Sequence, residues 1–439
     1  MVRLAGPLAA AEIGWMLMGI VDTMMVGRLE NSAAAIGAVS LGAAVFYTIG
    51  ITGSGLLLGL DTLVSQAFGA ERVDDCHHSL LNSVYLGLAL APVVMGAAFA
   101  CIPLAYRLGF DPVVLPLAIP YFKALMWSTP PLLLYCAFRR YLQAMNLVRP
   151  VVFALVTANL VNVVANWALI YGHLGAPRMG VEGAGWATCV SRGYMAAVLA
   201  FAIVLHDRRY GTGLWARVWR PDLERVRKLL ALGTPAAAQI LIEYGVFAAV
   251  ALLAGKLGAL PLAAHQIALQ TIAFTFMVPL GISSAAAVRV GQSIGRRDPA
   301  GAARAGWTAL LLAAAFMSCS ALTLILIPRW IARIYTPDPL VIATSVALLL
   351  VAAFFQLFDG IQVVATGALR GAGDTHTPMI LHGVIFWGVG LPLGYALAFH
   401  YGRGVVGLWV GLCLGLILVG STLLFVWHRR MHALAAEAG

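Results

Sequence analysis

Five acidic side chains lie inside hydrophobic segments of the chain, and their chemistry needs an explanation: Glu12, Asp22, Asp61, Glu243 and Asp359. A carboxylate at the centre of a bilayer costs about 2.5–3.5 kcal/mol on insertion scales. The sequence is 61% hydrophobic and only 10% charged. Against that background, five carboxylates in apolar surroundings indicate an ion or substrate pathway through a membrane.

Three of these carboxylates are the strongest candidates, because they lie well inside their apolar segments: Asp22, Glu243 and Asp359. Asp61 lies close to the end of its segment and is expected to be structural, while the role of Glu12 is left open. Burial disfavours the charged form of a carboxyl group, so it can bind and release a proton. Alternatively, several oxygen atoms can converge on a hard cation such as Na⁺.

Three amide side chains stand at helical spacing and could join Asp22 in one site. Asn159, Asn162 and Asn166 stand at i, i+3 and i+7, which places them on one face of a helix. If this helix meets the first segment, then Asp22, Asn162, Asn166 and the Thr188 hydroxyl would form a set of oxygen ligands that suits Na⁺.

A second polar stripe surrounds Asp359. Gln356 and Gln362 lie one turn on either side of Asp359, and Gln266 lies in another apolar segment. Lone amides are expected to hold helices together, at about 0.6 kcal/mol each. A stripe that contains a carboxylate is expected to take part in binding, so Gln266, Gln356 and Gln362 are additional candidates to line a cavity.

The composition identifies an integral membrane protein built from helices. Its mean hydropathy is +0.90, and its charged fraction is far below the roughly 25% of soluble domains. The apolar runs are about 20 residues long and continuous, unlike the alternating segments of a β-barrel. The net charge of +10 comes mainly from Arg in short loops, so it sets membrane topology and does not indicate nucleic-acid binding.

The six cysteines lie far apart, with no C-x-x-C and no paired Cys/His clusters at metal-ligand spacing. The sequence therefore predicts no cofactor. From the composition we expect contact with membrane lipids and with small solutes.

The hydrophobic runs predict twelve membrane spans. Basic residues gather in alternate loops, which predicts that both termini face the cytoplasm of a plasma membrane, the inner membrane if the source is bacterial. The predicted spans cover residues 4–26, 36–61, 80–105, 115–138, 150–171, 184–206, 231–254, 262–288, 304–328, 341–368, 378–400 and 405–427.

The two halves of the chain repeat one another. Pro7 recurs as Pro235, and Gln66-x-x-Gly69 recurs as Gln292-x-x-Gly295 in the same order. Six spans in each half give both halves the same direction of insertion. They should therefore be related by a pseudo-two-fold axis along the membrane normal. We expect an all-α architecture with an N-terminal six-helix lobe (1–206), a basic cytoplasmic linker (207–230) and a C-terminal six-helix lobe (231–439).

Short motifs spread over nearly the whole chain resemble the MATE family of multidrug and toxic compound extrusion transporters. The pair Glu243 and Asp359 makes the chain similar to the NorM branch of that family. The motifs are Val21-Asp22-Thr23-Met24-Met25-Val26-Gly27, Gln66-Ala67-Phe68-Gly69-Ala70, Ala263-Ala264-His265-Gln266-Ile267-Ala268, Arg289-Val290-Gly291-Gln292 and Leu369-Arg370-Gly371-Ala372-Gly373-Asp374.

The resemblance implies a V-shaped twelve-helix transporter that exports organic cations in exchange for Na⁺ or H⁺. It also implies two groups of site residues. The first is the N-lobe cation site of Asp22, Asn162, Asn166 and Thr188, and the second is the C-lobe acidic site of Glu243 and Asp359. One position departs from sodium-coupled members, which can carry Tyr one turn before the second acid. Here that residue is Phe355, which has no hydroxyl and so keeps H⁺ coupling open.

These observations predict a secondary active multidrug efflux antiporter for amphipathic organic cations. The alternative is a lipid-linked oligosaccharide flippase of the same superfamily, which would need a large cationic cavity for a pyrophosphate group. A more distant alternative is an integral membrane enzyme. His265 and His382 lie inside spans, but neither has a neighbouring Cys/His cluster in the sequence, so both are expected to be structural.

Overall fold

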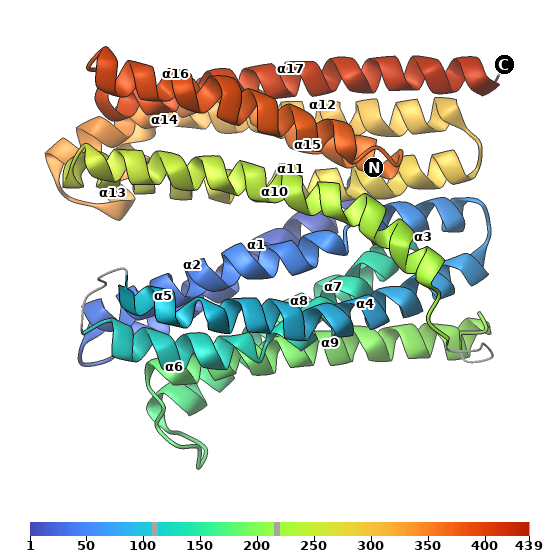
Figure 1. Ribbon diagram of the computed structural model, residues 1–439, viewed down its shortest axis with the longest axis horizontal. Helices are drawn as coiled ribbons and strands as arrows, with labels where there is room; N and C mark the ends of the chain where they lie inside the picture. The colour runs from blue at the N-terminus through green and yellow to red at the C-terminus, as the bar shows by residue number, and fades with distance from the viewer. Residues whose placement is uncertain (108–112, 215–219, 439) are drawn as a thin grey trace. The chain divides into compact units, whose positions relative to one another are not determined.

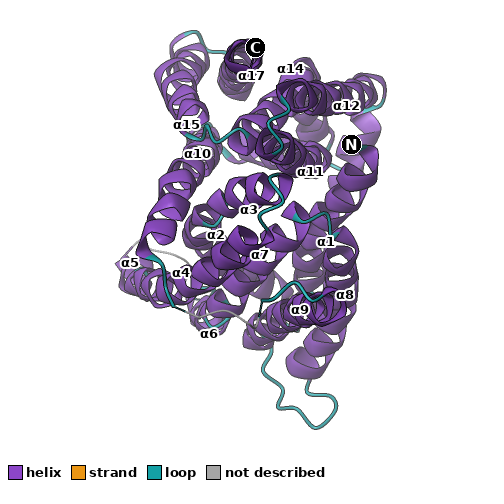
Figure 2. Cartoon of the chain, turned by 90° about the vertical axis from the view of Figure 1, so that its right-hand side faces the viewer, coloured by secondary structure: helices purple, strands orange, loops and turns teal. Residues whose placement is uncertain are grey.

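The computed structural model describes residues 1–107, 113–214 and 220–438. Within these ranges the secondary structure is entirely helical, and no strand is present (Figure 2). The all-α fold class predicted from the apolar runs is therefore confirmed. Residues 215–219 of the predicted linker lie outside the described ranges.

Eleven helical segments in the described part of the chain are long and apolar enough to cross a bilayer. Each overlaps one of the predicted spans (Figure 1). Their helices are α1 (Val2–Val26), α2 (Ser32–Leu56) with α3 (Gly59–Gly69), α4 (Val73–Ala100), α8 (Val148–Tyr171), α9 (Val181–Tyr210), α10 (Leu223–Lys256), α11 (Ala259–Gly295), α12 (Pro299–Leu326), α14 (Pro339–Gly371), α15 (His376–His382) with η1 (Gly383–Gly390), α16 (Leu391–Tyr395) and η2 (Ala396–His400), and α17 (Gly404–Ala438). Two short helices, α5 (Ile102–Arg107) and α13 (Pro328–Tyr335), accompany them.

The fourth predicted span is present as two helices, α6 (Leu115–Met126) and α7 (Thr129–Ala144). Pro130 and Pro131 open α7. Proline lacks a backbone N–H and disfavours helical geometry in the residue before it, so the helix is interrupted at this point. The hydroxyl of Ser128, at the break, donates to the carbonyl oxygen of Leu125.

By their internal contacts the described residues form two compact units. The N-terminal unit is Ile13–Ala237, and the C-terminal unit joins Met1–Glu12 with Ala238–Gly439. The predicted lobes were defined by the sequence repeat and not by contacts. Their boundaries and their symmetry axis remain predictions.

In the N-terminal unit, α9 is the helix that the others share: it packs against α6, α7 and α8. Aromatic and aliphatic side chains fill the core nearby, among them Phe46, Tyr121 and Ile170. A Cβ atom at Gly185 would lie 2.7 Å from the backbone oxygen of Tyr121. Glycine therefore allows α9 and α6 to approach closely, and α9 carries Thr188 into the interior.

In the C-terminal unit, α14 occupies the central position and packs against α11, α12 and α17. Gly367 and Gly371 stand four residues apart on α14, and a Cβ atom at either would collide with Ser283 or Ala287 on α11. Small residues at this spacing let two membrane helices come into backbone contact. The close contact fixes α14, which also carries Asp359.

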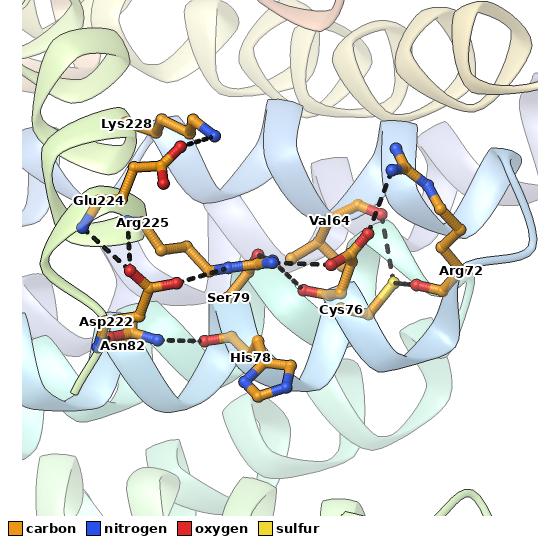
Figure 3. Close-up of polar contacts among 11 residues, drawn as sticks. Val64, Arg72, Cys76, His78, Ser79, Asn82, Asp222, Glu224, Arg225 and Lys228 are labelled. Carbon is orange, nitrogen blue, oxygen red and sulfur yellow. Dashed lines mark hydrogen bonds and ion pairs between the residues drawn. The ribbon is translucent and has the colours of Figure 1, made fainter. Parts of the chain in front are cut away.

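The first turn of α10 is tied to α4 within the N-terminal unit (Figure 3). The Arg225 guanidinium lies 2.7 Å from Asp75 Oδ1 and also donates to the Ser79 hydroxyl at 3.2 Å. The Asp222 N–H donates to Asn82 Oδ1 at 2.8 Å. Because these bonds use side chains from successive turns of α4, they hold the start of α10 in one register.

We expect Gly367→Ala to lower the free energy of unfolding by about 1–3 kcal/mol, because the added methyl group overpacks the contact between α14 and α11. Thermal unfolding of the purified protein in detergent measures this. Gly193→Ala on α9 is the matched control, since a Cβ atom there meets nothing within 4 Å. Equal stability of the two variants would contradict the close contact.

Candidate functional site

The structure brings Asp22 of α1, Asn162 and Asn166 of α8, and Thr188 of α9 together in the N-terminal unit. All four are buried. Asn166 Nδ2 donates to Asp22 Oδ1 at 2.6 Å, and Thr188 Oγ1 donates to Asp22 Oδ2 at 2.8 Å. Asn166 Nδ2 also donates to Asn162 Oδ1 at 3.0 Å. We call these four residues the Asp22 cluster.

The Asp22 cluster has the chemistry of an oxygen site for a hard cation. Carboxylate, amide and hydroxyl oxygens are the ligands that suit such ions. Asn166 Oδ1 is buried and has no hydrogen-bond partner among the described residues. An unsatisfied buried acceptor is costly unless something donates to it or binds it, so Asn166 Oδ1 is a candidate oxygen ligand, although the buried Asn162 Nδ2 beside it is a donor without a partner in the described part of the chain.

Two neighbours of the cluster have structural contacts instead. Asn159 Nδ2 donates to the backbone oxygens of Gly14 and Leu155, and so joins α8 to α1. Arg192 is buried and donates to the Ser128 hydroxyl at the break between α6 and α7. Its guanidinium also lies over the ring of Phe46, 4.6 Å from the centroid. Such a contact stabilises a desolvated guanidinium.

The C-terminal unit contains a second cluster, built around Glu243 of α10 and Asp359 of α14. Gln362 Nε2 donates to Glu243 Oε1 at 2.9 Å and to Asp359 Oδ1 at 3.4 Å. Gln239 Nε2 donates to Glu243 Oε2 at 3.0 Å from the preceding turn of α10. A single amide thus bridges the two acids, and we call these residues together with His382 the Glu243 cluster.

His382, which the sequence analysis expected to be structural, lies in this cluster. It is fully buried at the end of α15, and its Nε2 atom lies 2.8 Å from Gln362 Oε1 and 3.9 Å from Glu243 Oε2. The π-helical segment η1 begins at the next residue, and such segments are frequent at functional sites. In the sequence, His382 is a lone histidine near the start of a predicted span, and no regularly spaced neighbours mark it as part of a site.

The other predicted positions lie apart from the two clusters. Gln356 Nε2 donates to the hydroxyls of Thr275 and Ser320, so it ties α14 to α11 and α12. Gln266 is exposed on α11. Phe355 is buried and stacks on Trp409, with ring centroids 6.0 Å apart. A phenylalanine side chain has no oxygen atom to offer to Asp359.

Asp61 forms an ion pair with Arg140 at 3.0 Å, which agrees with the structural role expected for it. Glu12 is buried at 9% exposure and lies in the C-terminal unit. Over the described ranges, no group of three or more His, Cys, Asp or Glu side chains is arranged to hold a metal ion.

Comparison with known proteins decides the family. The MatE family model matches residues 7–168 and again residues 235–396. The chain belongs to the MatE family. As a member it is a multi-pass membrane transporter and not an enzyme, and the resemblance stated from its motifs is confirmed.

Curated relatives in the NorM branch cover almost the whole chain. The sequence is 37% identical over 436 residues to "Probable multidrug resistance protein NorM" of Mesorhizobium japonicum, covering 98% of this chain and 93% of that protein. It is 38% identical over 443 residues to "Multidrug resistance protein NorM" of Burkholderia vietnamiensis, covering 99% and 94%. Among solved structures, the eukaryotic MATE transporter AtDTX14 has a similar fold, with a TM-score of 0.87, 19% identity and coverage of 100% and 98%.

We expect Thr188→Val to lower the free energy of unfolding by about 1–3 kcal/mol, because the buried Asp22 carboxylate loses a donor. The thermal unfolding temperature of the purified protein reports this loss. The cost should shrink in an Asp22→Asn background, where the charged acceptor is gone. Thr48→Val is the control, since that exposed hydroxyl only bonds to Ala44 O of its own helix. Equal losses with Asp22 and with Asn at that position would contradict the contact.

Proposed function

We propose that this chain is a secondary active multidrug efflux antiporter that exports amphipathic organic cations in exchange for Na⁺ or H⁺. We place it in the plasma membrane, the inner membrane if the source is bacterial, with both termini in the cytoplasm. Its partners would be small organic cations such as drugs and dyes, the coupling cation and membrane lipids. It would need no cofactor and bind no nucleic acid.

The observation that carries the proposal is the pair of acidic clusters, in which Asp22 and Asp359 are buried and Glu243 is half-buried. Organic cations and coupling cations both need a negative partner in an apolar interior, and each unit supplies one. The Asp22 cluster offers oxygen ligands that suit Na⁺, while the Glu243 cluster offers two carboxylates bridged by one amide. The multidrug resistance names of the curated relatives point in the same direction.

The mechanism follows from competition for these carboxylates. An Na⁺ ion or a proton entering from outside would compensate the negative charge of an acidic cluster, and the bound organic cation would lose its counter-charge and leave outward. A one-for-one exchange of equal charges draws on the ion gradient alone. Each additional inward charge adds about 2.3 kcal/mol per 100 mV of membrane potential.

A lipid-linked oligosaccharide flippase is less well supported. A pyrophosphate group would need clustered cations, whereas both clusters are built around carboxylates. Arg192, a buried cation of the N-terminal unit, is engaged with Ser128 and aromatic rings.

The test is reconstitution in liposomes with ethidium as the transported cation, under an imposed Na⁺ gradient and then an imposed pH gradient. We expect movement with at least one gradient. Na⁺-driven movement would favour the Asp22 cluster as a sodium site, and pH-driven movement would favour carboxyl or imidazole groups as proton carriers. Absence of ethidium movement under both gradients would overturn the proposal in favour of the flippase.

We expect Glu243→Gln and Asp359→Asn to abolish ethidium export while leaving the amount of protein in the membrane unchanged, because each removes a counter-charge and keeps the side-chain shape. Export measured in cells, normalised to membrane-inserted protein, checks this. Gln356→Leu is the matched control, since that amide on the same helix only joins helices. Wild-type export by either acid variant would exclude the Glu243 cluster from transport.

A further inference from the structure

His382 is held in one orientation by its Nδ1 atom. The ring is fully buried, and Nδ1 lies 2.7 Å from the backbone oxygen of Pro378, one turn earlier in α15. A carbonyl oxygen only accepts hydrogen bonds. The proton of this contact must therefore belong to the ring, and Nδ1 carries a hydrogen.

The opposite ring atom, Nε2, faces an acceptor as well. It lies 2.8 Å from Gln362 Oε1, while Gln362 Nε2 faces Glu243 Oε1 and Asp359 Oδ1. Charged carboxylates only accept, so the NH₂ end of Gln362 must face them, and its oxygen must face the ring. The contact at Nε2 then also requires a ring hydrogen. If both acids are charged, this geometry therefore calls for hydrogens on both nitrogens, which makes His382 an imidazolium cation.

The reverse orientation of Gln362 is incompatible with two charged acids. It would turn the amide oxygen toward both carboxylates and leave three acceptors together, unless one carboxyl held a proton. A neutral ring has another donor within reach, because Gln239 Nε2 lies 3.4 Å from His382 Nε2. The Nε2 atom can therefore be hydrogen-bonded in both protonation states. The charged ring donates to Gln362 Oε1, and the neutral ring accepts from Gln239 Nε2 once Gln362 has moved its oxygen away.

We propose that His382 is the exchanging proton site of the Glu243 cluster and the resident counter-cation of its two acids. The inference rests on the proposed antiport function and specifies a proton as the ion exchanged in the C-terminal unit. When an organic cation binds to Glu243 and Asp359, the Nε2 proton of His382 leaves to water. When a proton returns to Nε2, the organic cation is released.

The exchange keeps the charge of the cluster constant. Two carboxylates with an imidazolium carry a net charge of −1, and two carboxylates with one organic cation and a neutral imidazole carry the same charge. The charged groups around the ring are Glu243 on α10, at 3.9 Å, and Asp359 on α14, reached through Gln362. Phe386 contributes only an aromatic edge. An organic cation seated on Glu243 would be close enough to repel a second positive charge on the ring.

The experiment measures proton release when ethidium binds to the purified protein in weakly buffered detergent solution, using a pH-indicator dye. We expect about one proton released per ethidium bound to the Glu243 cluster, and ethidium affinity that rises about tenfold per pH unit while His382 is protonated. In His382→Asn and His382→Gln, ethidium should still bind, with proton release and pH dependence reduced to a residual level. His265→Asn is the matched control, because His265 is an equally buried histidine whose Nδ1 instead accepts from Trp409 on α17.

A second measurement on the unaltered protein does not depend on how the variants fold. Infrared difference spectra on ethidium binding should show no loss of a carboxylic-acid C=O band, because both acids are charged before and after exchange. Loss of that band would assign the proton to Glu243 or Asp359 and overturn the inference. Unchanged proton release in both His382 variants would do the same while leaving the antiport function standing. Failure of ethidium to bind at all would remove the proposed function and this inference together.

Discussion

Compensation of buried charge is the constraint on which the rest of the structure depends. A carboxylate surrounded by apolar helices needs donors or a cation at all times. Asp22 obtains two donors from α8 and α9, and Glu243 obtains two from Gln239 and Gln362. Because Asn166, Thr188 and Gln362 lie on other helices than the acids to which they donate, each cluster also links the helices that carry it.

Close helix contacts fix the helices that carry the donors. Small residues let two membrane helices come into backbone contact. Gly367 and Gly371 seat α14 against α11, and Gly185 seats α9 against α6. The donors Gln362 and Thr188 are carried on these same two helices. Glycine-mediated packing and polar recognition are therefore parts of one arrangement.

The sequence predicted the spans and the shared face of Asn162 and Asn166 from regular spacing, whereas Asp22 and Thr188 joined them only on the condition that their helices meet and through the family resemblance. Long apolar runs identify membrane helices, and i, i+3, i+7 spacing placed Asn162 and Asn166 on one face. It could not separate Gln356 from Gln362, since both flank Asp359 by about one turn and only the rotation of α14 distinguishes them. The place of His382 in the Glu243 cluster was not predicted because Gln362 and Glu243 lie on other helices. The break before α7 was missed because the apolar run continues through it.

The structure of the fourth span has a consequence for how the chain is assembled during synthesis. Helices of 12 and 16 residues extend about 18 and 24 Å, each shorter than a hydrocarbon core of roughly 30 Å. Neither half is long enough to cross the hydrocarbon core alone, and α7 carries Arg139, Arg140 and Gln143 in its last two turns. Within the N-terminal unit α7 packs mainly against α4 and α9, and α9 is translated later than α7. The packing of α6 and α7 against α9 can therefore be completed only after α9 has been synthesised.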